Sequence, residues 1–220
     1  MRLFASERFE EHTPPPGHPE RPERAAVFTA VASHFHANGG TVVEPRCATL
    51  DELMRVHTAA YVRDISERAG RPTMIDEDTF TSPESHEIAS LAAGAAIDAA
   101  RHAFATGEPA MALVRPPGHH AEPERAMGFC LYNSIAVAAA ALRADGVSRV
   151  AIVDIDVHHG NGTQAAFYDD PSVLFVSSHQ FPYWPGTGAS AEQGQGPGRG
   201  FTVNLPLPSG TGDVGYELAY

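Results

Sequence analysis

Short apolar runs alternate with helix-like stretches through much of the chain. Nearly continuous apolar runs predict buried strands over residues 110–114, 149–157, 172–178 and 201–205. Helical patterns fall before and between these runs, at residues up to 36, 82–105, 133–143 and 162–168, and a last helix opens after Leu205. This alternation is typical of an α/β protein in which helices cover both faces of a parallel sheet.

Two of the helix starts carry capping residues. Thr49 precedes Asp51 and Glu52, which predicts an N-cap followed by acidic residues in the first turn. In Ser82-Pro83-Glu84 a candidate N-cap is followed by proline, which suits the first helical position. We expect the Ala-rich helix that starts there to run to about Ala105.

The unusual polar residues come where predicted strands end. Residues 115–121, RPPGHHA, follow the strand at 110–114, and residues 154–162, DIDVHHGNG, end the strand at 149–157. Ligands of open parallel sheets bind beyond the carboxyl ends of the strands. We therefore expect a functional site at this edge of the sheet.

Asp154, Asp156 and His158 are spaced two residues apart. In a strand, this spacing places all three side chains on one face, with Ile155 and Val157 packing on the other. Carboxylate and imidazole groups in register can hold a divalent metal, and imidazole suits Zn, Fe or Ni better than Mg. The alternative is a set of hydrogen-bonded polar residues that closes the strand. Three such residues are costly to bury unless they are paired or bind metal, which favours the metal site.

Two neighbouring histidines and two aromatic residues extend the candidate site. His119 and His120 sit on a stiff Pro-Pro-Gly turn, where rigid placement suits acid–base groups, although a surface loop with incidental histidines would show the same pattern. Phe129 and Trp184 each adjoin glycines or a Pro-Gly turn and could wall a narrow apolar tube; packing in the core is the alternative.

Composition narrows the class of protein. The 15 basic residues, all arginine, and 27 acidic residues give a net charge of −12, which argues against binding to nucleic acid or to an anionic membrane. Cys47 and Cys130 show no paired pattern, so neither a disulfide framework nor a Cys-based zinc site is predicted. The first residues lack the apolar core of a secretory signal, and the apolar stretch at 135–142 is too short for a bilayer. We expect a soluble, cytoplasmic protein.

Taken together, the motifs resemble the zinc-dependent histone deacetylase superfamily, which includes acetoin-utilisation proteins and acetylpolyamine amidohydrolases. The matching segments are HPERP at 18–22, RVHTAAYV around His57, DTFTSPES at 78–85, AAG at 92–94, RPPGHHA, GFCLYN, DIDVHHGNGTQ, VSSHQFPYWPGTG and FTVNLPL. The HHGNG form, in place of HHGDG, resembles the class II branch and its bacterial relatives. The resemblance implies one catalytic domain over residues 1–220, with a three-layer α/β/α fold and a mainly parallel sheet of the arginase/deacetylase type.

The resemblance also implies roles for individual residues in hydrolysis of an acetyl amide on acetyl-lysine or an acetylated polyamine. Asp156 and His158 would be two of three protein ligands of a catalytic Zn²⁺. His120 would be the general base and then the acid, with Asn161 orienting it from behind. His119 would lie beside the base, hydrogen-bonded to Asp154. Gly128, Phe129 and Trp184 would line the substrate tunnel, and Arg21 would lie at an internal channel. A structural monovalent cation such as K⁺ would be bound by Asp154, Asp156, His158, Ser177 and Ser178.

The sequence departs from the family pattern after Leu205. Neither the GFDAH-like segment, with the third Zn²⁺ ligand, nor the GGY-like segment, with the oxyanion donor, is found there, and Asp213 is a poor substitute for the missing ligand. We therefore expect an N-terminal portion of the domain, without its later strands and helices, that is weakly active, inactive or unstable alone.

Two other functions are open at this point. The first is a non-catalytic module that binds an acyl-lysine or a partner, against which the intact His119, His120, Asp156 and His158 argue. The second is a ureohydrolase of the arginase type, which would need an Asp-rich two-metal site that RPPGHHA does not supply. The natural substrate, the acyl group and the oligomeric state stay open.

Overall fold

The computed structural model describes residues 1–220, and its strands form two three-stranded parallel sheets and a small hairpin. In the first sheet the order is β2-β1-β5, and in the second it is β6-β7-β8. The hairpin pairs β3 with β4 in antiparallel fashion. The strand bounds are β1 Arg2–Ala5, β2 Thr41–Val43, β3 Thr73–Met74, β4 Phe80–Thr81, β5 Ala110–Leu113, β6 Val150–Asp154, β7 Val173–Gln180 and β8 Thr202–Leu207.

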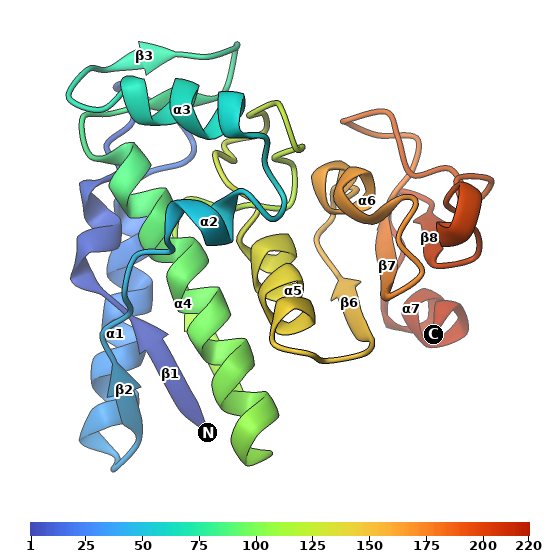
Figure 1. Ribbon diagram of the computed structural model, residues 1–220, viewed down its shortest axis with the longest axis horizontal. Helices are drawn as coiled ribbons and strands as arrows, with labels where there is room; N and C mark the ends of the chain where they lie inside the picture. The colour runs from blue at the N-terminus through green and yellow to red at the C-terminus, as the bar shows by residue number, and fades with distance from the viewer.

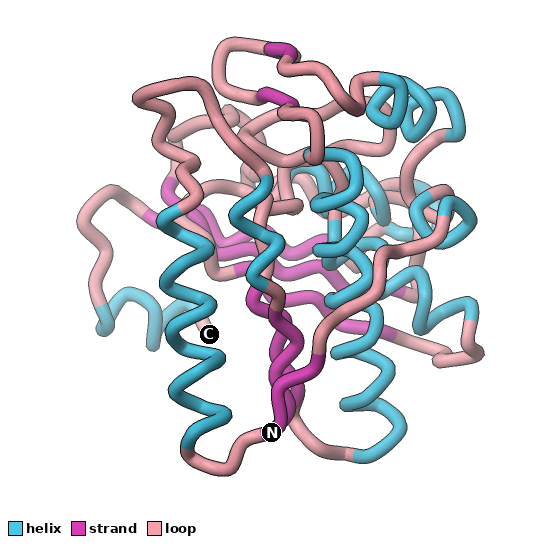
Figure 2. Tube along the Cα trace, turned by 90° about the vertical axis from the view of Figure 1, so that its left-hand side faces the viewer, coloured by secondary structure: helices cyan, strands magenta, loops and turns pink.

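Helices lie on both sides of the strands, so the α/β/α layering expected from the sequence is confirmed (Figures 1 and 2). The α-helices are α1 Glu23–Ala37, α2 Leu50–Leu53, α3 Ala59–Glu67, α4 Ser85–Thr106, α5 Ser134–Ala144, α6 Asn161–Phe167 and α7 Asp213–Ala219, with 3₁₀ turns η1 Glu7–Glu11 and η2 Gly196–Gly198. None of these helices has the length and apolar character needed to span a bilayer.

The largest apolar core lies where α4 and α5 pack together with α2 and α3. Its 14 buried residues include Leu53, Ile65, Ile97, Leu131 and Val137. A second core packs α5 and α6 against β6 and β7. The small residues Ala89 and Ala93 allow α4 to pack closely, and they share one helix face with Ile97 at intervals of four. These cores fix the loops that follow β5, β6 and β7.

The predicted elements are largely confirmed, with two corrections at their ends. Thr49 caps α2 through a capping box with Glu52, as its sequence indicates. The helix expected to start at Ser82 instead begins at Ser85, because the Ser82 hydroxyl accepts a hydrogen bond from the Thr13 amide, 3.1 Å away, rather than capping the helix.

The second correction concerns the strand expected over 149–157. β6 ends at Asp154, and Ile155 and Val157 are exposed instead of packing in the core. Asp154 Oδ1 accepts the Asp156 amide at 3.1 Å, and Asp156 Oδ1 accepts the His158 amide at 2.8 Å. These local bonds replace ladder hydrogen bonds and turn the chain, so a strictly strand-like projection of the three side chains is wrong.

The facing edges of β5 and β6 have no strand partner. Between them lies a cleft of about 780 Å³, whose floor is formed by alanines of α4 and by α5. The β6 residue Val153 is 57% exposed and the adjoining Ile155 is 71% exposed. Unpaired, apolar strand edges of this kind favour association with further β-structure.

Candidate active site at the carboxyl ends of β5, β6 and β7

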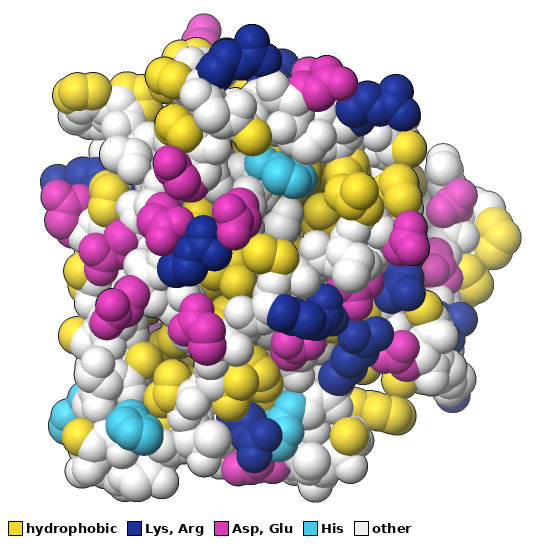
Figure 3. All heavy atoms as spheres, turned by 60° about the vertical axis from the view of Figure 1, so that its left-hand side comes forward, with side chains coloured by type: hydrophobic (Ala, Val, Ile, Leu, Met, Phe, Trp, Pro, Cys, Tyr) yellow, Lys and Arg dark blue, Asp and Glu magenta, His cyan; other side chains and the backbone are white.

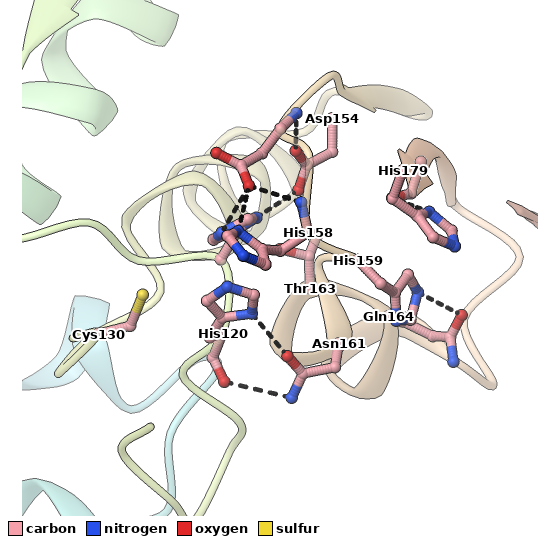
Figure 4. A network of polar contacts seen from close by, with 12 residues as sticks. His120, Cys130, Asp154, His158, His159, Asn161, Thr163, Gln164 and His179 are labelled. Atoms are coloured by element: carbon pink, nitrogen blue, oxygen red, sulfur yellow. Dashed lines mark hydrogen bonds and ion pairs between the residues drawn. The ribbon is translucent and has the colours of Figure 1, made fainter. Parts of the chain in front are cut away.

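Three loops that follow parallel strands of the two sheets bring the candidate residues together. His119 and His120 lie after β5, residues 154–161 lie at the end of β6, and Trp184 lies after β7. The His120 ring centroid is 3.9 Å from that of His119, 5.8 Å from that of His158 and 4.5 Å from that of Trp184. Segments far apart in the sequence thus form one cluster beyond the carboxyl ends of the strands, where the sequence predicts a functional site (Figure 4).

The His119 ring is tied to Asp154. Its Nδ1 lies 2.8 Å from Asp154 Oδ2, and because an ionised carboxylate only accepts, Nδ1 carries the hydrogen. Burial disfavours the charged form of both groups, but their hydrogen bond and mutual attraction outweigh it. The pKa of His119 is raised and the pKa of Asp154 is lowered, because each group stabilises the charged form of the other in this partly buried contact.

His120 is 4% exposed, and its ring is held by Asn161. Its Nδ1 lies 2.8 Å from Asn161 Oδ1, and no hydrogen bond reaches its Nε2. Burial, assisted by the neighbouring His119, lowers the pKa of His120 to about 3. The ring is therefore neutral at pH 7, with a free nitrogen, as a proton acceptor requires.

Asp156 and His158 form the more exposed wall of the cluster. His158 Nδ1 lies 3.0 Å from Asp156 Oδ1, and the His158 and Asp156 side chains are 35% and 49% exposed, respectively. Tyr183 stacks on the His158 ring at a centroid distance of 5.4 Å. Sequence reasoning did not single out Tyr183, although its place beside Trp184 in the PYWPGTG segment was a usable signal.

These two side chains fit part of a zinc site. An imidazole and a carboxylate are ordinary zinc donors, and a catalytic zinc usually has three protein ligands and one open position. No group of three His, Cys, Asp or Glu residues is arranged to hold a metal in this chain. The donor types therefore agree with zinc, while the number of donors is short by one.

Gly128 and Trp184 border the His120 ring. Gly128 has φ +57°, and a Cβ at this position would lie 2.5 Å from Trp184 Cη2 and 2.6 Å from His120 Cδ2. Only glycine allows this approach with that backbone conformation. Phe129 has φ +68° and packs edge-on against His18 at a centroid distance of 5.1 Å, so its immediate aromatic partner is His18.

Ser177 and Ser178 are fully buried at the end of β7. Ser177 pairs with Asp154 in the parallel ladder, and its Oγ lies 3.0 Å from His179 Nδ1. Ser178 Oγ accepts a hydrogen bond from the Tyr220 hydroxyl at 3.0 Å. Of the residues predicted around a monovalent cation, Asp154 on β6 and Ser177 and Ser178 on β7 therefore lie on adjacent strands.

Arg21 is not brought into the cluster. Its side chain is exposed, and no hydrogen bond or ion pair joins it to the other candidate residues. The buried arginine is Arg115, which is 2% exposed, donates from Nε to Glu20 at 2.7 Å and from Nη1 to the Phe9 carbonyl at 2.7 Å. This pair anchors the start of the loop that carries His119 and His120.

Sequence reasoning missed further polar partners of the site. Glu122 accepts a hydrogen bond from Asn161 Nδ2 at 2.8 Å. His159 lies 2.8 Å from the Thr187 hydroxyl and thereby links the β6 loop to the segment that carries Trp184. Both contacts join residues far apart in sequence, and their residue types alone gave no signal.

Comparisons with known proteins agree with this arrangement. A family model described as the histone deacetylase domain matches residues 18–220. A protein of Archaeoglobus fulgidus named "Probable deacetylase" is 44% identical over 216 residues, which are 96% of this chain and 60% of that protein. A "Probable deacetylase" of Methanothermobacter thermautotrophicus is 46% identical over 79% of this chain and 54% of its own length.

A solved structure gives the same result for the fold. The crystal structure of the HDA15 HD domain superposes with a TM-score of 0.87 at 38% identity, covering 95% of this chain and 63% of that one. The chain thus spans a little over half the length of these relatives.

Proposed function

The chain belongs to the histone deacetylase family, and from this premise we propose that its site serves zinc-dependent hydrolysis of an acetyl amide on a primary amine. The substrates we propose are acetyl-lysine in a protein or an acetylated polyamine. The observation that carries the proposal is the buried, neutral His120, whose Nδ1 is held by Asn161 while its Nε2 has no partner. That arrangement suits a group that accepts a proton from water and later donates it to a leaving amine.

Asp156 and His158 would hold the zinc ion. When bound, the ion supplies polarisation of the acetyl carbonyl and makes the attacking water more acidic. With two of the usual three protein ligands present, we expect weak metal binding and slow turnover by this chain alone.

His119 and Asp154 serve His120 electrostatically. The Asp154 carboxylate holds a hydrogen on His119 Nδ1, which fixes the His119 ring beside the ring of His120. Burial is the main cause of the lowered pKa of His120, and the neighbouring His119 lowers it further, which keeps the His120 ring in its proton-accepting form.

Trp184, Gly128 and Phe129 form the proposed substrate tunnel. Trp184 stands edge-on to His120 at an interplanar angle of 80°, and Gly128 leaves room beside both rings. An aliphatic amine side chain would be held by apolar contact along such a wall, with its acetyl group at His120. We also propose that Asp154, Asp156, His158, Ser177 and Ser178 surround a structural K⁺ ion; the exposed Arg21 is left outside the proposed site.

The acetyl amide is uncharged, but a polyamine or a basic peptide carries positive charge on its other amines, and the charge of the chain is compatible with such substrates. The net charge is −12, and on the face shown in Figure 3 arginines are interspersed with acidic residues instead of forming a continuous basic area. Such a surface favours a cationic amine over nucleic acid as a partner. The cytoplasmic location stays a prediction.

The test combines zinc binding with turnover. Zinc affinity is measured by calorimetry for the wild-type chain, Asp156→Asn and His158→Ala, with Asp213→Asn as a control that removes one acidic charge outside the cluster. Acetate release from an acetyl-lysine peptide and from an acetylated diamine is followed by mass spectrometry. We expect zinc binding that both site variants weaken and the control does not, and slow hydrolysis that a chelator stops.

A non-catalytic binding module is the second candidate, since no group of three metal-binding side chains is present. It predicts binding of the acetylated peptide without zinc and without acetate release. That result would overturn the proposal of an enzyme.

A further inference from the structure

Asn161 stands between a carboxylate and the imidazole of His120. Its Nδ2 is 2.8 Å from Glu122 Oε1, and its Oδ1 is 2.8 Å from His120 Nδ1. Weaker contacts from Nδ2 reach Met127 Sδ at 3.3 Å and the His120 carbonyl at 3.4 Å. Asn161 is 5% exposed, so its amide has few alternative partners.

Glu122 is held in place by its own backbone. Its amide donates to the Arg125 carbonyl at 2.9 Å, and its carbonyl lies 3.1 Å from His57 Nδ1. The only hydrogen-bond donor to its carboxylate is Asn161. The position of this carboxylate is thus set by the loop and not by a competing ion pair.

The contacts determine how the amide is oriented. An ionised carboxylate only accepts hydrogen bonds, so Asn161 must turn its NH₂ group toward Glu122. Its oxygen then faces His120 Nδ1, and an amide oxygen also only accepts. His120 therefore carries its hydrogen on Nδ1, which leaves the lone pair on Nε2.

We propose that Glu122 is a positioning residue that fixes the tautomer of His120 through Asn161, and that it requires a neutral amide at position 161. This inference rests on the proposed function in one respect: the proposed reaction is what supplies the proton that His120 Nε2 accepts. The hydrogen-bond chain Glu122–Asn161–His120 itself exists without substrate or metal.

The requirement for an amide follows from charge. In Asn161→Asp, a second carboxylate would face Glu122 at hydrogen-bond distance, and two carboxylates so close cannot both be ionised without cost. In the double variant that adds Glu122→Gln, the new glutamine amide can donate a hydrogen bond to the new carboxylate at position 161, which relieves the repulsion. The two substitutions should therefore be non-additive.

The first experiment measures the tautomer of His120 in the unloaded chain at pH 7. Long-range ¹H–¹⁵N spectra of the protein with ¹⁵N-labelled histidines show which nitrogen of each ring is protonated. The His120 signals are identified because they are lost in His120→Gln. We expect the Nδ1–H form in the wild type, a mixture of both forms in Glu122→Ala, and no change in Glu124→Ala, which removes an exposed carboxylate from the same loop. An unchanged Nδ1–H form in Glu122→Ala would overturn the proposal.

The second experiment is a thermal double-mutant cycle. Asn161→Asp should lower the melting temperature by roughly 4 °C or more, and adding Glu122→Gln should restore most of that loss. Equal losses with and without Glu122→Gln would contradict the requirement for an amide.

Activity gives a separate readout. Where hydrolysis is measurable, Glu122→Ala should lower kcat roughly 10-fold, as the loss of an orienting partner does, and leave KM unchanged. A tautomer that shifts as expected in a chain without any hydrolysis would uphold the role of Glu122 and refute the proposed function. Hydrolysis by the wild type together with an unshifted tautomer in Glu122→Ala would uphold the proposed function and refute the role of Glu122.

Discussion

Individual carboxylates decide the local geometry of the site. Asp154 and Asp156 each accept a backbone amide two residues ahead, which ends β6 and turns His158 toward His120. Asp154 uses its other oxygen to hold His119. One aspartate therefore stops the strand and orients a ring of the candidate site at the same time.

Gly128→Ala tests the close packing beside His120. The substitution imposes the strain of a left-handed backbone, about 1–2 kcal/mol, and overpacking against Trp184 and His120 adds about 1–3 kcal/mol. Gly70→Ala is a matched control, because Gly70 has φ +78° and open space where its Cβ would lie. In urea unfolding we expect Gly128→Ala to be clearly the less stable variant; equal losses would show that the packing is looser than described.

At the scale of elements, hydrogen bonds attach the segment 181–188 to the end of β6 and to β7. His159 Nε2 lies 3.1 Å from Gln164 Oε1, an acceptor, so its Nδ1 accepts from the Thr187 hydroxyl at 2.8 Å. His179 Nε2 lies 2.9 Å from the Gly188 carbonyl. These bonds hold the loop that presents Trp184 to His120.

Thr187→Val should loosen this loop, because valine keeps the shape of threonine but cannot donate to His159. Trp184 is the only tryptophan in the chain, so its fluorescence reports the loop directly. We expect emission at longer wavelength and stronger quenching by acrylamide, while Thr187→Ser, which keeps the hydroxyl, behaves like the wild type. Identical quenching in Thr187→Val and the wild type would refute the anchoring role.

The sequence predicted most elements from β5 onward, because each strand there is a continuous apolar run and each helix has a clear period. It placed the end of β6 wrongly, since residues 155–157 look apolar while side-chain hydrogen bonds of Asp154 and Asp156 interrupt the ladder. It contained no sign of β2, which is three residues long and is stabilised by pairing with β1. Glu122 escaped notice because its role depends on a contact with a residue 39 positions away.

At the scale of the whole molecule, buried neutral histidines make stability depend on pH. His57 Nε2 accepts the Asn133 amide at 2.9 Å, and burial lowers the pKa of His57 to about 4. Burial likewise lowers the pKa of His12 to about 3. Both rings become protonated near pH 6.5 in the unfolded chain, so the unfolded state binds more protons as the pH falls.

These two histidines alone are therefore expected to leave stability intact above about pH 6.5 and to lower it by roughly 2 kcal/mol per pH unit between about pH 6 and pH 4. Urea unfolding at pH 7 and pH 5 measures this loss, and His57→Gln should reduce its slope. Equal stability at both pH values would mean that these rings are not kept neutral in the fold.

The open edges of β5 and β6 predict self-association. We expect light scattering to rise with protein concentration and to be reduced in Val153→Lys with Ile155→Lys, which place charge at the cleft. Leu218→Lys adds charge at an 84% exposed position on α7 and serves as the control. Equal scattering in all three proteins would place the association elsewhere.

The role of His120 is tested most directly by the rate of acetate release from an acetyl-lysine peptide, measured for the zinc-loaded chain and for His120→Ala. We expect slow release by the wild type and a further loss of about 10²- to 10⁴-fold in the variant, with zinc content unchanged in both. Equal rates, or no acetate from the zinc-loaded wild type, would contradict the assignment of His120 as the group that moves the proton.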